Sequence, residues 1–200
     1  MASDVSICSR ALHKLGAGTI TTLDDNNERA RVMKQAYEPV RLAELRRHRW
    51  KFALKRVSLP ALSDAPDSDY GYAYELPADF LRLVEGGDLA SCADLNDYRG
   101  GASALYSLEG RQILTHLGAP LAIRYIANIT DTALMDAAFI ETLSCRLAFE
   151  CVERITESSS KKDELRKDYN QSVKDAIRAN AMEGASQSPA DAEWVMARLG

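Results

Sequence analysis

Histidine, cysteine and serine side chains could bind a metal or attack a substrate, but in this chain none has the spacing that either task needs. The histidines (His13, His48 and His116) have no partner at the spacing of a zinc motif such as HExxH. No serine stands in a GxSxG frame. The cysteines lack CxxC spacing, which indicates reduced thiols in a cytosol. They are Cys8, Cys92, Cys145 and Cys151. We therefore predict no metal, no cofactor and no catalytic residue.

Two pairs of aspartates stand close together, Asp24 with Asp25 and Asp67 with Asp69. Roles in turns and helix caps explain these pairs better than acid–base catalysis does. A small hydrolase whose site is assembled from residues distant in sequence stays open as a hypothesis, because one sequence cannot show such an assembly.

A dense run of cations is the strongest candidate for a binding surface. Seven basic residues fall between positions 41 and 56, namely Arg41, Arg46, Arg47, Arg49, Lys51, Lys55 and Arg56. Such a run suits an acidic protein partner or passing DNA. The alternative is a solvated helix end that the helix dipole favours, with Trp50 as a core anchor. The residues alone leave both interpretations open.

The last residues offer a second contact. An apolar cluster of Trp194, Met196 and Leu199 follows a small and polar stretch at 184–189. An apolar cluster on a tether often docks onto another chain, which is the role we predict for the C-terminal tail 184–200. Packing back onto its own domain is the alternative.

Charge is distributed unevenly along the 200 residues. The chain has a net charge of −4, a pI near 5.5 and 46% hydrophobic residues, which favours a packed core and argues against a globally basic nucleic-acid binder. Residues 1–60 carry 12 Lys and Arg against 6 Asp and Glu, whereas residues 61–100 carry 2 against 9. A balance of +6 followed by one of −7 suits electrostatic docking. No apolar run is long enough for a membrane span and no secretory signal is visible, so we expect no membrane partner.

Helical spacing predicts two helices before residue 50, over 4–15 and 28–48. Gly16 suits the left-handed position after the first. Pro39 predicts a kink in the second, or two helices that meet at Glu38.

A change of pattern after Trp50 predicts a small antiparallel β region over 51–128. It includes a strand from Phe52 to Leu59 and a hairpin that turns at Gly110. Helices return at 131–155 and 161–181 as an α-hairpin. The predicted fold is therefore mainly α within the α+β class. It is a helical bundle (1–50 and 129–183) with an inserted β region (51–128) and an extended tail (184–200).

Four pieces of the sequence, taken in order, resemble a known family. The first is the opening helix and its exit: Leu12, Leu15, Gly16, Ile20, Leu23, Asp25 and Ala30. The second is Arg41, Leu45 and Arg46, then Trp50, Lys51, Phe52, Ala53 and Leu59. The third is an aromatic strand, an LPxD turn and an arginine: Tyr72, Tyr74, Leu76, Pro77, Asp79 and Arg82. With the final helical pair, most of the chain resembles the head-to-tail adaptor, or tail tubular protein A-like, connector proteins of tailed bacteriophages.

The resemblance implies a structural role without catalysis. Such proteins form a ring, typically of twelve copies, under the portal of the virion. The ring extends the DNA channel and offers a platform to the next tail or nozzle protein. Implied partners are therefore the portal, further copies of the chain, that tail component and DNA that passes without sequence-specific contact. The location implied is the head–tail junction, after synthesis in the cytoplasm of a bacterial host.

A closed ring needs two unlike faces that complement each other. The basic N-terminal part and the acidic segment 61–100 could supply them, with the basic run against a neighbour or the portal and the tail along the portal. The alternative function is a DNA-binding packaging or regulatory module that uses residues 41–56.

Overall fold

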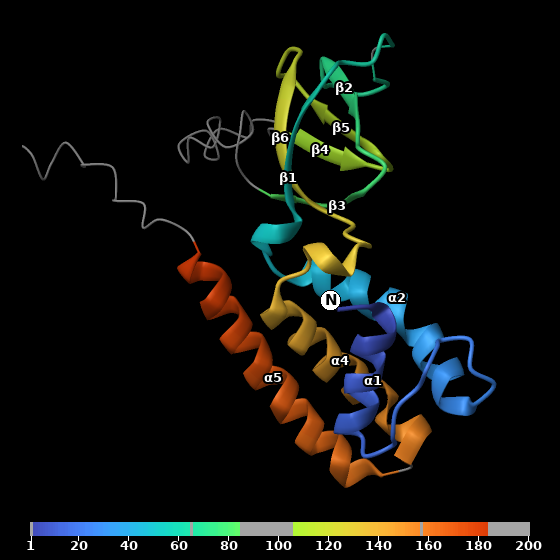
Figure 1. Ribbon diagram of the computed structural model, residues 1–200. Helices are drawn as coiled ribbons and strands as arrows, with labels where there is room; N and C mark the ends of the chain where they lie inside the picture. Colours follow the sequence, from blue (N-terminus) through green and yellow to red (C-terminus); the bar gives the residue numbers. More distant parts are fainter. Residues whose placement is uncertain (1, 65, 85–105, 157, 184–200) are drawn as a thin grey trace, which may run out of the picture.

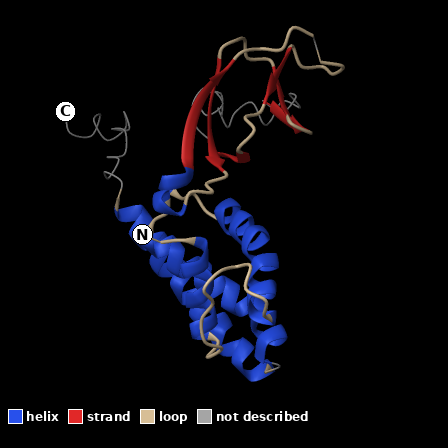
Figure 2. Cartoon of the chain, turned by 45° about the vertical axis from the view of Figure 1, so that its right-hand side comes forward, coloured by secondary structure: helices blue, strands red, loops and turns tan. Residues whose placement is uncertain are grey.

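The helices gather at one end of the molecule and the strands at the other (Figures 1 and 2). The computed structural model describes residues 2–64, 66–84, 106–156 and 158–183. Its helices are α1 (Asp4–Lys14), α2 (Glu28–Arg47), α4 (Ala137–Thr156) and α5 (Ser159–Met182). Its strands are β1 (Leu54–Leu59), β2 (Tyr72–Glu75), β3 (Phe80–Val84), β4 (Tyr106–Glu109), β5 (Gln112–Thr115) and β6 (Leu121–Ala127). The predicted mainly helical α+β fold is confirmed.

Helix α4 lies at the centre of the bundle and packs against α1, α2 and α5. Its apolar residues face almost every direction, which is typical of a helix enclosed by others. Local signals set the ends of the outer helices. Ser3 and Ser6 form a capping box at the start of α1, and the Asn27 side chain accepts a hydrogen bond from the Ala30 amide (2.8 Å) at the start of α2. After α1, Gly16 takes a φ of 68°, as its place after the helix predicted.

Helix α2 continues without a break through Pro39, so the prediction of two helices meeting at Glu38 is wrong. Pro39 is exposed. Buried residues on both sides of the proline, Met33 and Leu45 among them, fix the helix to the core. Tertiary packing therefore outweighs the hydrogen bond that the proline ring removes.

The β region consists of two three-stranded antiparallel sheets, in the orders β1-β6-β3 and β2-β5-β4. The predicted hairpin is present as β4 and β5, and Gly110 takes a φ of 57° in the turn. Phe52 does not belong to a strand as predicted, because a short 3₁₀ turn, η1 (Lys51–Ala53), precedes β1. The helix predicted from residue 131 starts later, at Ala137. A separate 3₁₀ turn, η3 (Thr132–Leu134), precedes this helix.

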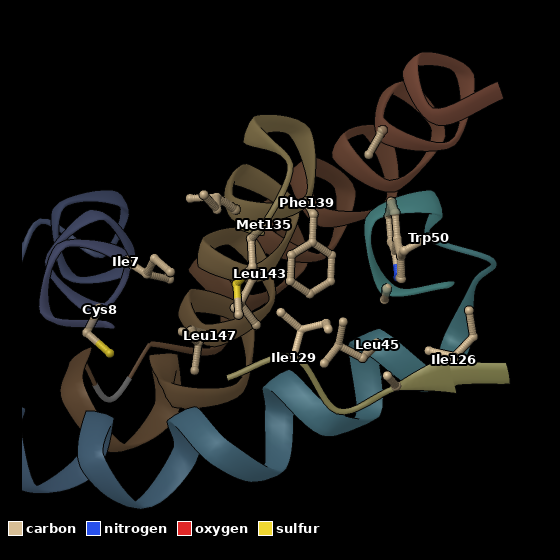
Figure 3. Packing of buried hydrophobic residues seen from close by; sticks show 14 of the residues in the cluster. Ile7, Cys8, Leu45, Trp50, Ile126, Ile129, Met135, Phe139, Leu143 and Leu147 are labelled. Atoms are coloured by element: carbon tan, nitrogen blue, oxygen red, sulfur yellow. The ribbon is translucent and has the colours of Figure 1, made fainter. Parts of the chain in front are cut away.

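The bundle and the sheets share a core at their junction (Figure 3). Trp50 is 1% exposed and meets Phe139 of α4 edge-on, with 5.1 Å between ring centroids. Its indole N–H donates to the Glu44 carbonyl (2.9 Å). The same hydrophobic cluster includes Ile126 of β6 and Tyr74 of β2. Each sheet is therefore packed into one interior with the helices.

Candidate interaction surfaces

Arg41 lies in the interior, so its predicted role as a partner contact is wrong. The residue is 3% exposed. Its guanidinium donates to the Asn128 side chain (2.7 Å) and to the Ile129 carbonyl, just after β6. A signal for this existed in the sequence, because Met33, Arg41 and Leu45 recur at multiples of four and therefore share one helix face. Arg41 joins α2 to the end of the β region.

Several other cations of the run bond to separate parts of their own chain. Arg46 donates to the Leu81 carbonyl (3.0 Å), and Lys51 donates to the Ala181 carbonyl (3.3 Å). Lys55 forms an ion pair with Asp79 (2.7 Å). The run therefore connects α2, β1, β3 and α5. Arg46, Arg47 and Arg49 nevertheless remain exposed beside the end of α2.

Arg47 belongs to a polar network between helices that sequence analysis missed. The Tyr169 hydroxyl of α5 donates to Glu44 Oε2 (2.7 Å) and accepts a hydrogen bond from Arg47. Arg146 of α4 lies over the Tyr169 ring, 5.1 Å from its centroid, and the Phe149 ring is parallel to it. The network joins α2, α4 and α5 at one point.

Glu44 is 2% exposed, and its Oε1 is buried without a hydrogen-bond partner among the described residues. Burial raises the pKa of Glu44 above its ordinary value, although the Tyr169 hydrogen bond and the charges of Arg47 and Arg146 oppose this. Burial and the Glu44 hydrogen bond raise the pKa of Tyr169 to about 12. The network therefore holds a buried carboxylate between three helices, with Arg47 at its exposed edge.

The predicted LPxD turn positions residues of both sheets. Asp79 accepts hydrogen bonds from Lys55 (2.7 Å) and from the Tyr125 hydroxyl of β6 (2.9 Å). The Pro77 carbonyl accepts from Arg111 (2.7 Å), and the Leu76 amide donates to the Arg111 carbonyl (2.9 Å). The turn therefore links β1, β6 and the β4–β5 hairpin.

The aromatic strand before that turn has one buried and one exposed tyrosine. Tyr74 is fully buried and donates to the Leu117 carbonyl (2.7 Å), whereas Tyr72 is 43% exposed. Arg82 is half-buried on β3, and its Nε has no partner in the described part of the chain. Tyr72 is thus the member of the motif with the most surface to offer.

Exposed charge of opposite sign gathers in two places. The acidic one lies within the segment 61–100 that the sequence analysis singled out, whereas the basic one, on α5, was missed. Lys167, Lys174 and Arg178 are exposed on α5. Asp64, Asp67 and Asp69 are exposed on the segment before β2. The α5 cations have the helical spacing of one face, a signal that was readable but unused.

Two hollows on the surface have volumes of about 410 and 390 Å³. The first combines Asp4, Glu38 and Asp131 with the buried Arg41. The second lies between α1 and α4, where Lys14 pairs with Glu141 (2.6 Å). Within residues 2–64, 66–84, 106–156 and 158–183, no group of three or more metal-ligating side chains could hold an ion. Over the same residues, no helix has the length and apolar character to cross a bilayer.

The predicted tail contacts Trp194, Met196 and Leu199 lie outside the described residues and stay a prediction. Comparison of the chain with known protein families and with curated proteins finds no match.

Proposed function

We propose that the chain is a structural subunit of the ring that connects the head of a tailed bacteriophage to its tail. The observation that supports this is the position of the residues that carry the resemblance. Trp50 anchors the junction between bundle and sheets, and the LPxD turn at Asp79 ties β1 to β6. The motifs thus organise a β region inserted into a helical bundle.

In this role the protein makes no covalent bonds and acts by shape and charge. A ring of such subunits, typically twelve, lies under the portal, lets DNA pass and receives the next tail or nozzle protein. A ring requires a heterologous interface between unlike faces of neighbouring copies. The separate surfaces of opposite charge on α5 and before β2 support such an interface.

Assembly with a portal tests the proposal. The full chain is mixed with the portal protein of the phage that encodes it, and mass is measured by size-exclusion chromatography with light scattering for the pair and for each alone. We expect a large complex whose electron micrographs show a second ring coaxial with the portal. The portal of an unrelated phage is the control. A mixture that elutes as its separate components would contradict the proposal.

The alternative, a DNA-binding packaging or regulatory module, requires residues 41–56 as a free basic surface. Arg41 is interior, and Lys51 and Lys55 bond to their own chain, so this segment offers fewer free cations than its sequence indicates. The alternative predicts binding to duplex DNA that falls steeply with salt. Failure to bind a duplex at low salt would eliminate it.

A further inference from the structure

One face of α5 presents exposed positive charge, with an exposed apolar residue beside it. Lys167, Lys174 and Arg178 are separated by seven and four residues, so they lie on the same face of the helix. Ile177, 39% exposed, lies at the edge of this face, one turn of the helix after Lys174. We call these four residues the α5 stripe. Neither lysine forms an ion pair within the described residues, and Arg178 is 75% exposed with only a 3.5 Å contact to Asp175.

The end of α2 adds further positive charge beside α5, on the side of the helix that packs against the bundle. Arg47 donates to Tyr169 of α5, and the Asn180 side chain donates to the Arg49 carbonyl (2.9 Å). These bonds hold exposed arginines beside α5. Met182, 85% exposed on the last turn, adds apolar surface at the same end.

A matching negative surface lies at the other end of the molecule. Asp64, Asp67 and Asp69 are exposed, and none has a hydrogen bond or an ion pair with the described residues. Leu62 is 37% and Tyr72 43% exposed beside them. We call these five residues the acidic loop. The Leu62 amide donates to the Ala73 carbonyl (2.8 Å), which fixes the start of the loop to β2. No lysine or arginine occurs between residues 57 and 81.

The two surfaces cannot meet within one copy. Figure 1 shows the segment before β2 at the tip of the β region, the end away from the helices, whereas α5 runs along the bundle. Both surfaces combine exposed charge with exposed apolar side chains, so within the described residues each lacks a partner of the chemistry that the other offers.

We propose that the α5 stripe of one copy binds the acidic loop of the next copy. This inference deepens the proposed function and rests on it, because it names the heterologous contact that closes the ring. Ile177 and Met182, on either side of the row of cations, cover Leu62 and Tyr72, while the three cations face the three aspartates. DNA is the poorer partner, because phosphates would leave Ile177 exposed and would meet the carboxylates of Asp168 and Asp175 on the same helix.

Charge reversal on each surface of the full chain tests the contact. One variant is K167E/K174E/R178E and the other is D64K/D67K/D69K. All six residues are exposed, and circular dichroism checks that both variants fold. Sedimentation equilibrium of concentrated protein at low salt measures self-association. Each variant alone should associate about tenfold or more weakly than the wild type, since attraction becomes repulsion at three pairs.

An equimolar mixture of the two variants should restore association, because each reversed surface then meets its complement in the other variant. The control is R29E/R31E/K34E at the start of α2, which reverses three exposed cations and should associate like the wild type. Raised salt should weaken the wild-type contact.

Wild-type protein that stays monomeric at low salt, variants that associate normally or a mixture that restores nothing would each overturn the inference. So would a stripe variant that loses only its affinity for a duplex DNA oligonucleotide. Ring formation on the portal is measured separately. A ring that forms with either variant would therefore refute this contact and leave the proposed function intact.

Discussion

Glu44 carries a carboxylate into the interior, so its protonation should be visible in the stability of the protein. Because burial raises its pKa in the folded state, the folded protein binds a proton there more readily than the unfolded chain does. The unfolding free energy contributed by this group therefore falls as pH rises from the ordinary carboxyl pKa through the raised one.

Glu44→Gln removes that dependence because the amide stays neutral. Urea unfolding of the wild type and of E44Q over a pH series should give a difference that shifts in favour of E44Q as pH rises. Glu38→Gln, the same substitution at an exposed position of the same helix, is the matched control. A pH-independent difference for E44Q would contradict the assignment.

Asp79 should behave in the opposite way. Burial alone would raise its pKa, but hydrogen bonds from Lys55 and Tyr125 outweigh this, and the pKa lies below its ordinary value. Its contribution to stability is therefore lost as pH falls through that lowered pKa. Asp79→Ala should lower the unfolding free energy by about 1–2 kcal/mol, because the buried Tyr125 hydroxyl loses its acceptor.

A double-mutant cycle with Lys55→Ala isolates the ion pair from the tyrosine bond. Half of the Lys55 side chain is exposed, so the coupling energy should be only about 0.5 kcal/mol. Tyr125→Phe should recover most of the loss seen in Asp79→Ala when the two are combined. If the effects of Asp79→Ala and Tyr125→Phe are additive, the hydrogen bond between Tyr125 and Asp79 contributes nothing to stability.

Single residues also mark the limit of inference from sequence. A run of cations at 41–56 indicates a basic surface, but Arg41 has partners 87 and 88 positions further on, at Asn128 and Ile129. Local spacing can show that Arg41 shares a face with Met33. It cannot show that Asn128 and Ile129 accept hydrogen bonds from Arg41, because their position depends on where β6 ends.

Among the elements, α2 tolerates a proline that its sequence predicts should break or bend it. Pro39 is exposed and removes one backbone hydrogen bond from an unbroken helix. Pro39→Ala should therefore raise the unfolding free energy by about 1–3 kcal/mol in chemical denaturation. Glu38→Ala is the control and should change stability by less than about 0.5 kcal/mol. A destabilised P39A would mean that the proline shapes packing that α2 needs.

Element types were predictable where periodicity extends over several turns or strands, as in α1, α5 and the β4–β5 hairpin. The errors fall at short junctions. Phe52 fits the alternation of a strand, but it lies in a 3₁₀ turn. There its ring packs against that of Phe139, with 5.0 Å between the ring centroids. Asp136 caps the start of α4 by accepting from the Ala138 amide (2.7 Å), five residues later than predicted. The first error reflects a tertiary contact that local alternation does not show, and the second a local cap that competes with the apolar pattern.

At the scale of the molecule, the bundle and the β region share one hydrophobic cluster, so they should unfold together. Trp50 reports on the junction, while ellipticity at 222 nm reports mainly on the helices. In a Trp194→Phe background, which leaves Trp50 as the only tryptophan, both signals should give the same denaturation midpoint. Two separated midpoints would show that the β region is an independent folding unit.

The predicted tail can be tested against this same core. Among the residues that the structure describes, the buried hydrophobic ones lie between Ile7 and Ala176, so a chain that stops after Glu183 should keep its fold, with a melting temperature within about 4 °C of the full chain. If the tail anchors the ring subunit to the portal, this truncation should lose portal binding in the same light-scattering experiment. Avidity in a ring multiplies a small effect per copy, so the loss should be large.

Replacing Trp194, Met196 and Leu199 with alanine in the full-length chain separates the apolar side chains from the length of the tail. Undiminished portal binding by the truncated chain would remove the tail from the interface and leave the bundle and β region to carry it.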